Sequence, residues 1–255
     1  MTHLLIIEAN TPDMPPAAAG FVEAFARLDR TVSIAQHAPY TDPLAADHLA
    51  GVDGVVFTGS GVAWSTDAAQ AKPQRDAMEL VFQHGLASWG SCNGMQLATV
   101  VLGGVVGACP KGIEVGVAQN LARADTEHPM FVGRAATWET PCIHRDETQR
   151  LPIGAVLSAT NDHSPVQAFA YEHNGVDFWG TQYHPELSTP RIADYMRNRD
   201  GIFRNHTDMI ADLDLAETNE QAAARLGTTP DTLAFDTRTL ELANWLAHVK
   251  DRKTT

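Results

Sequence analysis

Residues 85–102, with the sequence GLASWGSCNGMQLATVVL, decide the fold that this chain is expected to adopt. An apolar run of strand length leads to Cys92, and an apolar helical pattern begins after it. Gly90 and Gly94 flank the cysteine, so the chain can turn tightly and leave the Cys92 side chain at the top of a sheet. The stretch predicts a nucleophile elbow whose thiol faces a helix N-terminus, where the partial positive charge favours the thiolate. The alternative is a buried cysteine that acts as a small hydrophobic residue.

The segments before this elbow follow the pattern of a parallel sheet. Helical periodicity predicts one helix that opens at Pro15-Pro16 and continues to Leu28, and a second helix over residues 73–84. Apolar runs of strand length separate these helices, at residues 4–9, 31–35 and 54–57. Strands alternating with helices of this size form βαβ units. We therefore expect an α/β fold with a doubly wound, mostly parallel sheet.

After Leu102 the pattern changes to short strands with glycine turns. Strands are expected at residues 103–107, 113–117, 155–157, 166–171 and 176–183. Asn174-Gly175 lies between the last two, and Asn-Gly between strand patterns is a strong hairpin signal. This section predicts an antiparallel flank of the sheet, with a loop at residues 141–144 and a helix at residues 189–204.

The last part of the chain has a helical pattern of its own. Residues 218–226 are rich in alanine and end at Gly227, a suitable C-cap, and residues 230–249 are amphipathic. We expect two helices in a C-terminal extension, residues 207–255, packed on the catalytic domain, residues 1–206, or on a partner. A separate domain of this size would be too small to bury a core of its own.

Composition and charge exclude several classes of partner. With 255 residues, 44% hydrophobic and 19% charged, the chain is typical of a globular protein. Its net charge of −13 argues against nucleic acid and against an anionic membrane surface, because both are bound through basic patches. No apolar run approaches the roughly 20 residues of a membrane span, and the N-terminus lacks the basic start of a signal peptide.

The cysteines and histidines indicate neither a disulfide framework nor a metal site. The chain has three cysteines, an odd number without paired spacing: Cys92, Cys109 and Cys142. Three histidines that might be grouped as ligands, His144, His163 and His184, lie on separate segments without the spacing of a zinc site. We expect a cytoplasmic protein that uses no metal and no cofactor.

A histidine and a carboxylate follow the strand expected before residue 183. His184 and Glu186 lie two residues apart, so in extended geometry their side chains point to the same side. The carboxyl edge of a doubly wound sheet is where ligands bind, and a carboxylate there can orient an imidazole that takes a proton from the Cys92 thiol. Taken alone, His184-Pro185-Glu186 is more often a surface turn than a catalytic pair.

A glycine-rich segment ends another strand at the same edge. The backbone of Thr58-Gly59-Ser60-Gly61 can turn an N–H toward a developing oxyanion, although such a segment alone is usually a loop. The N–H of Asn93, directly after the cysteine, would be the second donor. Elbow, loop and His-x-Glu therefore predict cysteine-dependent acyl transfer.

At these residues the chain resembles the class I, triad-type glutamine amidotransferases, and in particular a stand-alone GMP-synthase-like amidotransferase domain. Residues 90–96, GSCNGMQ, match the Gly-x-Cys-x-Gly-x-Gln motif, and residues 184–186 match His-Pro-Glu. The resemblance covers roughly residues 3–205. It implies a flavodoxin-like fold in which Cys92 attacks the γ-amide of glutamine or of an N-substituted γ-glutamyl amide, giving a γ-glutamyl thioester.

The resemblance also implies a role for each motif residue. His184 would be the general base and then the acid that protonates the leaving amine, and Glu186 would orient it. Gly59 aligns with the oxyanion-hole glycine of the family, beside Asn93, and Gln96 with a glutamine that holds the substrate. Ser60 replaces a glycine of the family's oxyanion loop and is expected to contact the substrate. The segment with His163, Ser164 and Pro165 resembles the one whose backbone reads the α-amino and carboxylate groups.

Several functions remain open at this stage. The first hypothesis is a free-standing hydrolase of a γ-glutamyl amide, a small-molecule substrate, and the second is a glutaminase subunit that feeds ammonia to a separate synthetase. A non-catalytic binding protein on the same fold and a cysteine peptidase are more remote alternatives. Two roles stay open for the extension, support of a homo-oligomer or a docking surface. Residues 144–147, HRDE, either line the amine side of the pocket or form a solvated loop, and Trp64 is either a lid or a packed aromatic.

Overall fold

The computed structural model describes residues 1–124, 127–198 and 201–254. Within these residues the main sheet has nine strands in the order β2-β1-β3-β4-β11-β10-β9-β6-β7. The first five of these strands pair in parallel: β2 (Ser33–His37), β1 (His3–Ile7), β3 (Gly54–Phe57), β4 (Ala87–Ser91) and β11 (Val176–Thr181). The predicted doubly wound α/β fold is confirmed, and β4, which leads to Cys92, lies near the middle of the sheet.

The other strands of the main sheet are antiparallel, as predicted. They are β10 (Ala168–His173), β9 (Val156–Thr160), β6 (Glu114–Arg123) and β7 (Thr137–His144). Asn174 and Gly175, both with positive φ, form the turn between β10 and β11, as the Asn-Gly signal predicts. A small antiparallel sheet pairs β5 (Val105–Ala108) with β8 (Asp146–Arg150).

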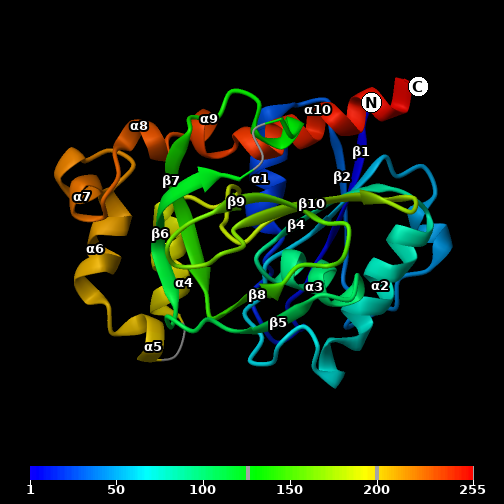
Figure 1. Ribbon diagram of the computed structural model, residues 1–255, viewed down its shortest axis with the longest axis horizontal. Coiled ribbons are helices and arrows are strands. Elements are labelled where there is room, and N and C mark those ends of the chain that lie inside the picture. The colour runs from blue at the N-terminus through cyan, green and yellow to red at the C-terminus, as the bar shows by residue number, and fades with distance from the viewer. Residues whose placement is uncertain (125–126, 199–200, 255) are drawn as a thin grey trace.

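Helices cover both faces of the sheet. Alternate residues of β1 pack in two cores: Leu4 and Ile6 on one face, Leu5 and Ile7 on the other. Figure 1 shows α1 (Ala19–Leu28) close to α10 (Leu240–Thr254), with α2 (Lys72–Gln83) and α3 (Asn93–Val101) on the other side. Short 3₁₀ turns, η1 (Ala46–Leu49), η2 (Ala69–Ala71) and η3 (Pro129–Phe131), join these elements.

The loop predicted at residues 141–144 is wrong, because these residues end β7. A proline usually interrupts a sheet, but β7 is an edge strand, where the missing N–H of Pro141 costs no ladder hydrogen bond. The Pro141 carbonyl accepts a hydrogen bond of 2.9 Å from the His184 backbone N–H. The edge strand therefore holds the backbone of a predicted site residue.

The helix predicted at residues 189–204 is present in two pieces, α4 (Thr189–Arg197) and α5 (Gly201–Arg204); residues 199 and 200 lie outside the described part of the chain.

In place of the two helices predicted for the extension, the described residues form five: α6 (Thr207–Leu215), α7 (Glu220–Arg225), α8 (Pro230–Leu233), α9 (Phe235–Arg238) and α10. Gly227 has a φ of 71° and follows α7, and the Thr228 N–H returns to the Ala223 carbonyl at 3.0 Å, which confirms the predicted C-cap.

The helices after residue 207 share the apolar cores of the sheet. On α10, the Trp245 ring lies 5.7 Å from that of Phe25 and 6.4 Å from that of Trp89. Helices α6 to α8 pack their apolar residues on α4 and on the β6–β7 flank. The division between residues 206 and 207 stays a prediction, since no separate core marks it. Among the described residues, no helix has the length and apolar character needed to cross a membrane.

Two buried contacts tie α10 to the sheet near the candidate site. The Glu241 carboxylate is paired with the Arg134 guanidinium and accepts a hydrogen bond of 2.9 Å from the Tyr183 hydroxyl. All three side chains are buried, and Tyr183 directly precedes His184. At the other end of the helix, Lys253 Nζ donates to the Met1 carbonyl at 2.8 Å, so the two labelled ends in Figure 1 lie together.

Candidate active site

Cys92 lies at the turn between β4 and α3 in a strained backbone conformation. Its φ of 51° and ψ of −105° are unusual for a residue with a side chain. The Cys92 N–H donates to the Thr181 carbonyl of β11 at 2.7 Å, and its carbonyl accepts from the Gln96 N–H at 2.9 Å. The strand and the helix thus hold the turn from both sides, as a nucleophile elbow requires.

The two glycines of the elbow allow α3 to pack directly on the sheet. A Cβ on Gly90 would lie 2.5 Å from the Gly94 carbonyl carbon, and one on Gly94 would lie 2.4 Å from the Phe57 carbonyl oxygen. Both contacts are with backbone, which cannot move aside as a flexible side chain can. The glycines are therefore needed for the close approach of helix and strand as well as for the turn.

His184 and Glu186 form a buried hydrogen-bonded pair beside the elbow. His184 Nδ1 lies 2.7 Å from Glu186 Oε1, and both residues are 5% exposed. The other carboxylate oxygen accepts from Ser91 Oγ at 3.0 Å, and Ser91 Oγ accepts from Trp89 Nε1 at 3.0 Å. The carboxylate is fixed from β4, so it can hold the imidazole in one orientation.

The His184 imidazole is buried, and its surroundings raise its pKa. His184 Nε2 has no hydrogen-bond partner among the described residues. Burial alone would lower the pKa of His184, but the Glu186 carboxylate and the neighbouring Cys92 sulfur raise it to about 10. At neutral pH the imidazole is therefore protonated, the state that pairs with a thiolate and can later give its proton to a leaving group.

The other two cysteines are poor nucleophiles. Burial and the neighbouring Glu147 raise the pKa of Cys109, and burial also raises the pKa of Cys142. Both thiols stay protonated at neutral pH, whereas only the thiolate is nucleophilic. Cys92 is thus the cysteine that the geometry favours for covalent chemistry.

Gly59 lies against the His184 ring, at the end of β3. A Cβ at Gly59 would lie 2.7 Å from His184 Cε1, so a side chain there would displace the imidazole. The loop that follows is held by Asn10, whose Oδ1 accepts from the Gly61 N–H at 2.7 Å and from Ser60 Oγ at 3.1 Å. The Ser60 hydroxyl is also 2.9 Å from the Ala9 carbonyl, so it stabilises this loop.

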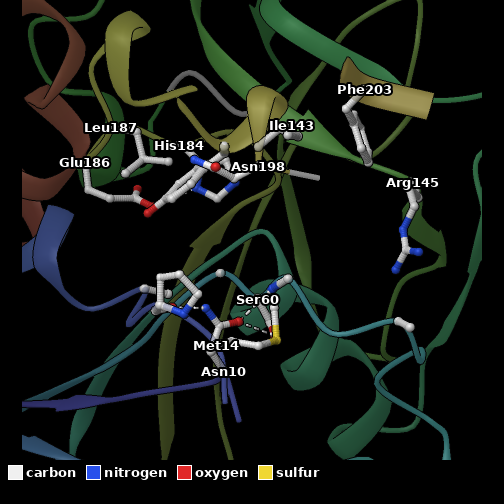
Figure 2. Close-up of a pocket in the computed structure, with 16 residues that line it drawn as sticks. Asn10, Met14, Ser60, Ile143, Arg145, His184, Glu186, Leu187, Asn198 and Phe203 are labelled. Carbon is white, nitrogen blue, oxygen red and sulfur yellow. Dashed lines mark hydrogen bonds and ion pairs between the residues drawn. The ribbon is translucent and has the colours of Figure 1, made fainter. Parts of the chain in front are cut away.

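Asn10 was missed by the sequence analysis, although a signal was present. It follows β1 at the carboxyl edge of the parallel strands, where ligands bind in such sheets. Its side chain lines a cavity beside His184 together with Ser60 (Figure 2). A polar residue directly after a buried strand is thus a site candidate even without a family motif.

Gln96 is buried beneath Cys92. Its Nε2 donates to the Asp146 carbonyl at 2.6 Å and lies 3.1 Å from Gln182 Oε1. Gln96 therefore connects α3 to the start of β8 and to the segment before His184, and it lines a small cavity of about 30 Å³ at Cys92. Arg145 and Asp146 line this cavity too. The role of Gln96 in holding a substrate stays a prediction.

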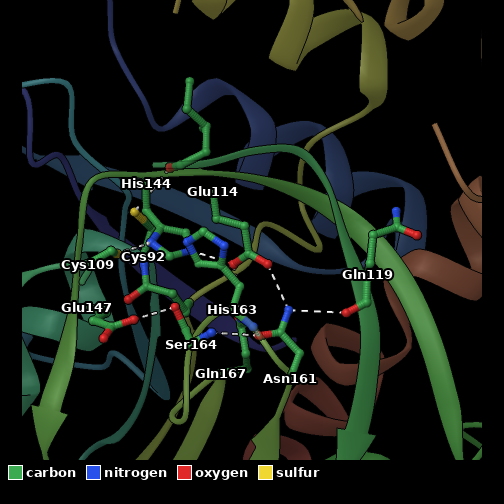
Figure 3. Close-up of polar contacts among 12 residues, drawn as sticks. Cys92, Cys109, Glu114, Gln119, His144, Glu147, Asn161, His163, Ser164 and Gln167 are labelled. Atoms are coloured by element: carbon green, nitrogen blue, oxygen red, sulfur yellow. Dashed lines mark hydrogen bonds and ion pairs between the residues drawn. The ribbon is translucent and has the colours of Figure 1, made fainter. Parts of the chain in front are cut away.

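Two of residues 144–147 are buried, so the solvated-loop alternative is wrong for His144 and Glu147, while Arg145 and Asp146 are half-buried. His144 Nε2 lies 2.7 Å from Glu114 Oε2, and its Nδ1 lies 3.4 Å from Cys109 Sγ (Figure 3). Burial alone would raise the pKa of Glu114, but its hydrogen-bond partners, led by His144, lower it. This network fixes the backbone of Arg145 and Asp146 beside Cys92.

The structure does not bring His163, Ser164 and Pro165 to Cys92. His163 Nε2 lies 3.1 Å from the Gly112 carbonyl, and Ser164 Oγ donates to Glu147. None of the three lines the cavities at Cys92 or His184 within the described chain. Ser164 contacts Glu147, and the His163 ring lies 6.1 Å from that of His144 (Figure 3), while the predicted contact of the three residues with the substrate stays untested.

Trp64 and the possible metal ligands are the last features that the sequence analysis considered. Trp64 lines the cavity at Cys92, while its Nε1 donates to the Tyr40 hydroxyl at 3.3 Å, so it is a packed aromatic at the rim. Possible metal ligands converge at two places among the described residues, both away from Cys92: His37, Asp42 and His48, and Glu172, Asp177 and His248.

A larger cavity of about 280 Å³ opens on the other side of the site (Figure 2). Gly59, His184 and Glu186 line it, together with residues that follow β1 and residues of α4 and α5. It shares Ser60, Ile143, Arg145 and Phe203 with the small cavity, so the two adjoin.

The fold and the site together define a class of protein, the doubly wound α/β proteins with a cysteine elbow and a buried His–Glu pair at the carboxyl edge. The family model for glutamine amidotransferase class-I matches residues 20–200. The chain therefore belongs to the class I glutamine amidotransferase family, as its motifs predict.

The chain is similar to proteins of different activities. The chain is 33% identical to a gamma-glutamyl-L-1-hydroxyisopropylamide hydrolase of a Pseudomonas species, over 81% of this chain and 76% of that protein. It is 34% identical to the GMP synthase [glutamine-hydrolyzing] of Heliobacterium modesticaldum over 63% of this chain, which spans only 29% of that relative. A solved glutamine amidotransferase of Thermotoga maritima has the same fold, with a TM-score of 0.69 over 97% of both chains at 18% identity.

Proposed function

We propose that this protein is a free-standing hydrolase of N-substituted γ-glutamyl amides that works through a γ-glutamyl thioester on Cys92. One observation carries the proposal: a preformed, buried His184–Glu186 pair stands beside the elbow cysteine and opens into a cavity of about 280 Å³. A glutaminase has to accommodate only ammonia there. The relative named as a γ-glutamyl amide hydrolase, of which the chain spans 76%, also supports it.

In the first step, the Cys92 thiolate attacks the γ-carbonyl carbon of the amide. The oxyanion that forms would accept hydrogen bonds from the backbone N–H groups of Gly59 and Asn93, which end β3 and begin α3. Protonated His184 faces the scissile bond through Nε2, while Glu186 keeps the ring oriented. The C–N bond breaks as His184 gives its proton to the leaving nitrogen, and the γ-glutamyl thioester remains on Cys92.

In the second step, the amine leaves and water takes its place beside His184. The imidazole, now neutral, removes a proton from the water, whose oxygen attacks the thioester carbonyl carbon. The C–S bond breaks, glutamate is released, and the thiolate–imidazolium pair is restored. No cofactor and no metal is required by this sequence of steps.

We assign recognition of the charged α-groups of the substrate to two residues beside Cys92. One is a cation, Arg145, which lines both cavities, and the other is a carboxylate, Asp146, which lines the small one. The α-carboxylate of the substrate would pair with the guanidinium and its α-ammonium with the carboxylate, since charge-assisted hydrogen bonds are strong in a partly buried site. Gln96 would support these α-groups of the substrate.

The second candidate is a glutaminase subunit for a separate synthetase, favoured by the GMP synthase relatives. Such a subunit would release ammonia slowly when alone and faster with its partner. The two candidates are distinguished by comparing the release of ammonia from glutamine with the release of amine from γ-glutamyl amides, using the full chain alone. Three free cysteines fit the reducing cytoplasm, where we place either activity.

Trapping tests the chemistry that both candidates share. The full chain is mixed with glutamine or a γ-glutamyl anilide, quenched in acid, and its intact mass and peptides are measured. We expect a γ-glutamyl adduct on Cys92, lost in Cys92→Ala and retained in Cys109→Ala and Cys142→Ala. An adduct on Cys109 or Cys142, or activity in Cys92→Ala, would overturn the assignment.

A further inference from the structure

We propose that the amine released by this hydrolase is uncharged apart from its amino group and carries an apolar alkyl or arylalkyl substituent, which occupies the cavity beside His184. The inference rests on the proposed hydrolysis of γ-glutamyl amides and names the substrate class. The cavity measures about 280 Å³. Ammonia is about the size of a water molecule, whose share of liquid volume is roughly 30 Å³, so it would leave most of this space unfilled.

The lining residues place the leaving amine in this cavity. Cys92 and Asn93 line the small cavity, whereas His184 and Gly59 line the large one. The proton donor has to reach the leaving nitrogen, so that nitrogen lies on the His184 side of the scissile bond. The substituent on the nitrogen then extends into the large cavity, away from the γ-glutamyl group.

The walls of this cavity are mainly apolar and come from distant parts of the chain. Met14 and Pro15 follow β1, Leu187 follows Glu186, and Tyr195 and Phe203 belong to α4 and α5. Figure 2 shows Leu187 near His184 and Met14 near Ser60, with Phe203 farther along the same space. An apolar substituent would be partly removed from water here, which favours binding by about 25 cal/mol for each Å² buried.

Apart from His184, whose Nε2 is assigned to the leaving nitrogen, the polar side chains of the described walls have partners. Asn10 and Ser60 hold the loop after β3, and Asn198 Nδ2 donates to the Asp194 carbonyl at 2.9 Å. A hydroxyl or amide on the substituent would therefore lose its hydrogen bonds to water and gain few hydrogen bonds to the protein.

The charged groups of the walls are also committed. Glu186 is bound to His184 and Ser91, so it is not available to a second ammonium group. Arg145 lies across the cavity from them (Figure 2), where Nη2 donates to the Val62 carbonyl at 3.0 Å, and we assign its charge to the α-carboxylate of the substrate. The remaining charged side chain of the described walls is the protonated His184, whose Nε2 is assigned to the leaving nitrogen. Substituents with a terminal ammonium or carboxylate would lose hydration without gaining a partner.

The test compares γ-glutamyl methyl-, propyl-, butyl- and benzylamides with the 4-aminobutyl- and 3-carboxypropylamides, all with the full chain. We expect kcat/KM to rise about fourfold for each added methylene, because burying one methylene contributes about 0.8 kcal/mol. The two charged amides are expected to be at least tenfold poorer than the butylamide. A flat series, or a preference for either charged amide, would overturn the inference while leaving the proposed hydrolysis intact. Failure to cleave glutamine and every amide would instead contradict the proposed function.

A variant with a smaller cavity tests the location. Ala17 lines the cavity and is half-buried, so Ala17→Leu places three more carbon atoms in it. We expect the ratio of kcat/KM for the benzylamide to that for the methylamide to fall at least tenfold. Ala26→Leu, at an exposed position of α1, is the matched control and should retain the ratio of the parent protein. An unchanged ratio in a folded Ala17→Leu variant would show that the amine binds elsewhere.

Discussion

At the scale of single residues, the candidate site depends on His184 keeping a positive charge while it is buried. Glu186 supplies the opposing charge, and Ser91 and Trp89 hold that carboxylate in turn. The ring also needs room, which the missing side chain of Gly59 provides. Both requirements can be tested with one substitution each.

The charge of His184 predicts a pH dependence. Its pKa is about 10 in the folded protein and about 6.5 when unfolded. The pair therefore stabilises the fold fully below pH 6.5, and its contribution is lost as the pH rises through 10. We expect kcat/KM to fall above about pH 10, and Glu186→Gln to move this alkaline limb to lower pH by one unit or more, measured on a γ-glutamyl amide. Glu23→Gln, an exposed carboxylate on α1, should keep the parent profile; an unmoved limb in Glu186→Gln would exclude Glu186 as the orienting group.

The space at Gly59 predicts a loss of activity without unfolding. In Gly59→Ala the new methyl group displaces the His184 ring, and a shift of that size costs about 100-fold in kcat. Gly112→Ala is the matched control: an added Cβ meets nothing within 4 Å there, but the φ of +85° makes the substitution strained. We expect the control to lose stability and keep its activity. Full activity in Gly59→Ala would show that the ring position is not critical.

At the scale of elements, the junction of β4 and α3 is the least tolerant place in the fold. Helix α3 rests on β3 and β4 through backbone contacts at Gly90 and Gly94, with no side chain between them. The strain at Cys92 persists because the strands on both sides are fixed in the centre of the sheet.

The close contact at Gly94 predicts a large loss of stability. A methyl group there would lie 2.4 Å from the Phe57 carbonyl oxygen, so α3 has to move away from the sheet. We expect Gly94→Ala to lower the free energy of unfolding by about 3 kcal/mol, measured by urea denaturation. Gly103→Ala, just after α3, meets no atom within 4 Å and should lose only about 1 kcal/mol to its positive φ. Equal losses in the two variants would contradict the role given to the contact.

Some helices, strands and turns could be predicted from their sequences, and others could not. The strand, the elbow and the His-x-Glu segment could be predicted, because each rests on local spacing and on the order of parallel strands. β7 could not, since Pro141 reads as a loop unless the strand is known to lie at the edge of the sheet. The break between α8 and α10 was missed too, because the amphipathic pattern continues through residues 230–249.

The parts of the site that stayed hidden are those assembled across long distances in the sequence. Met14 and Phe203 line one cavity, and no local pattern relates residues so far apart. His144 and Glu147 are polar enough to resemble a solvated loop, and only their buried partners reveal otherwise. Local sequence motifs identify the nucleophile, whereas the shape of the cavity beside His184 depends on how distant segments fold together.

At the scale of the whole molecule, the extension is part of the structure that holds the site. Helix α10 packs against α1 and the centre of the sheet, and its Glu241 contacts Tyr183, the residue before His184. The extension therefore influences the position of the histidine without touching it. A buried pair of charges, Arg134 and Glu241, carries this connection.

Removing one member of that pair predicts a loss that a second substitution recovers. Glu241→Leu leaves the Arg134 charge buried and unpaired, which is expected to cost about 3–5 kcal/mol in urea denaturation. Adding Arg134→Met removes the orphaned charge and should restore most of the stability. The surface pair between the exposed Arg225 and the half-buried Asp212 is the control, and Arg225→Gln should cost much less than Glu241→Leu. If the double variant were as unstable as Glu241→Leu, the loss would come from packing.

The position of α10 also affects when the core can close during synthesis of the chain. A ribosome extends a chain from its N-terminus, and β1 emerges long before residues 240–254 are made. Until then Leu4 lacks Trp245 and Val249, its neighbours in the finished core, and that face of the sheet stays open to water. A nascent chain that already carries Cys92, His184 and Glu186 thus holds every group of the reaction without a closed core. Helix α10 closes this face of the sheet, so we expect the proposed activity to begin only after residues 240–254 have been made and packed.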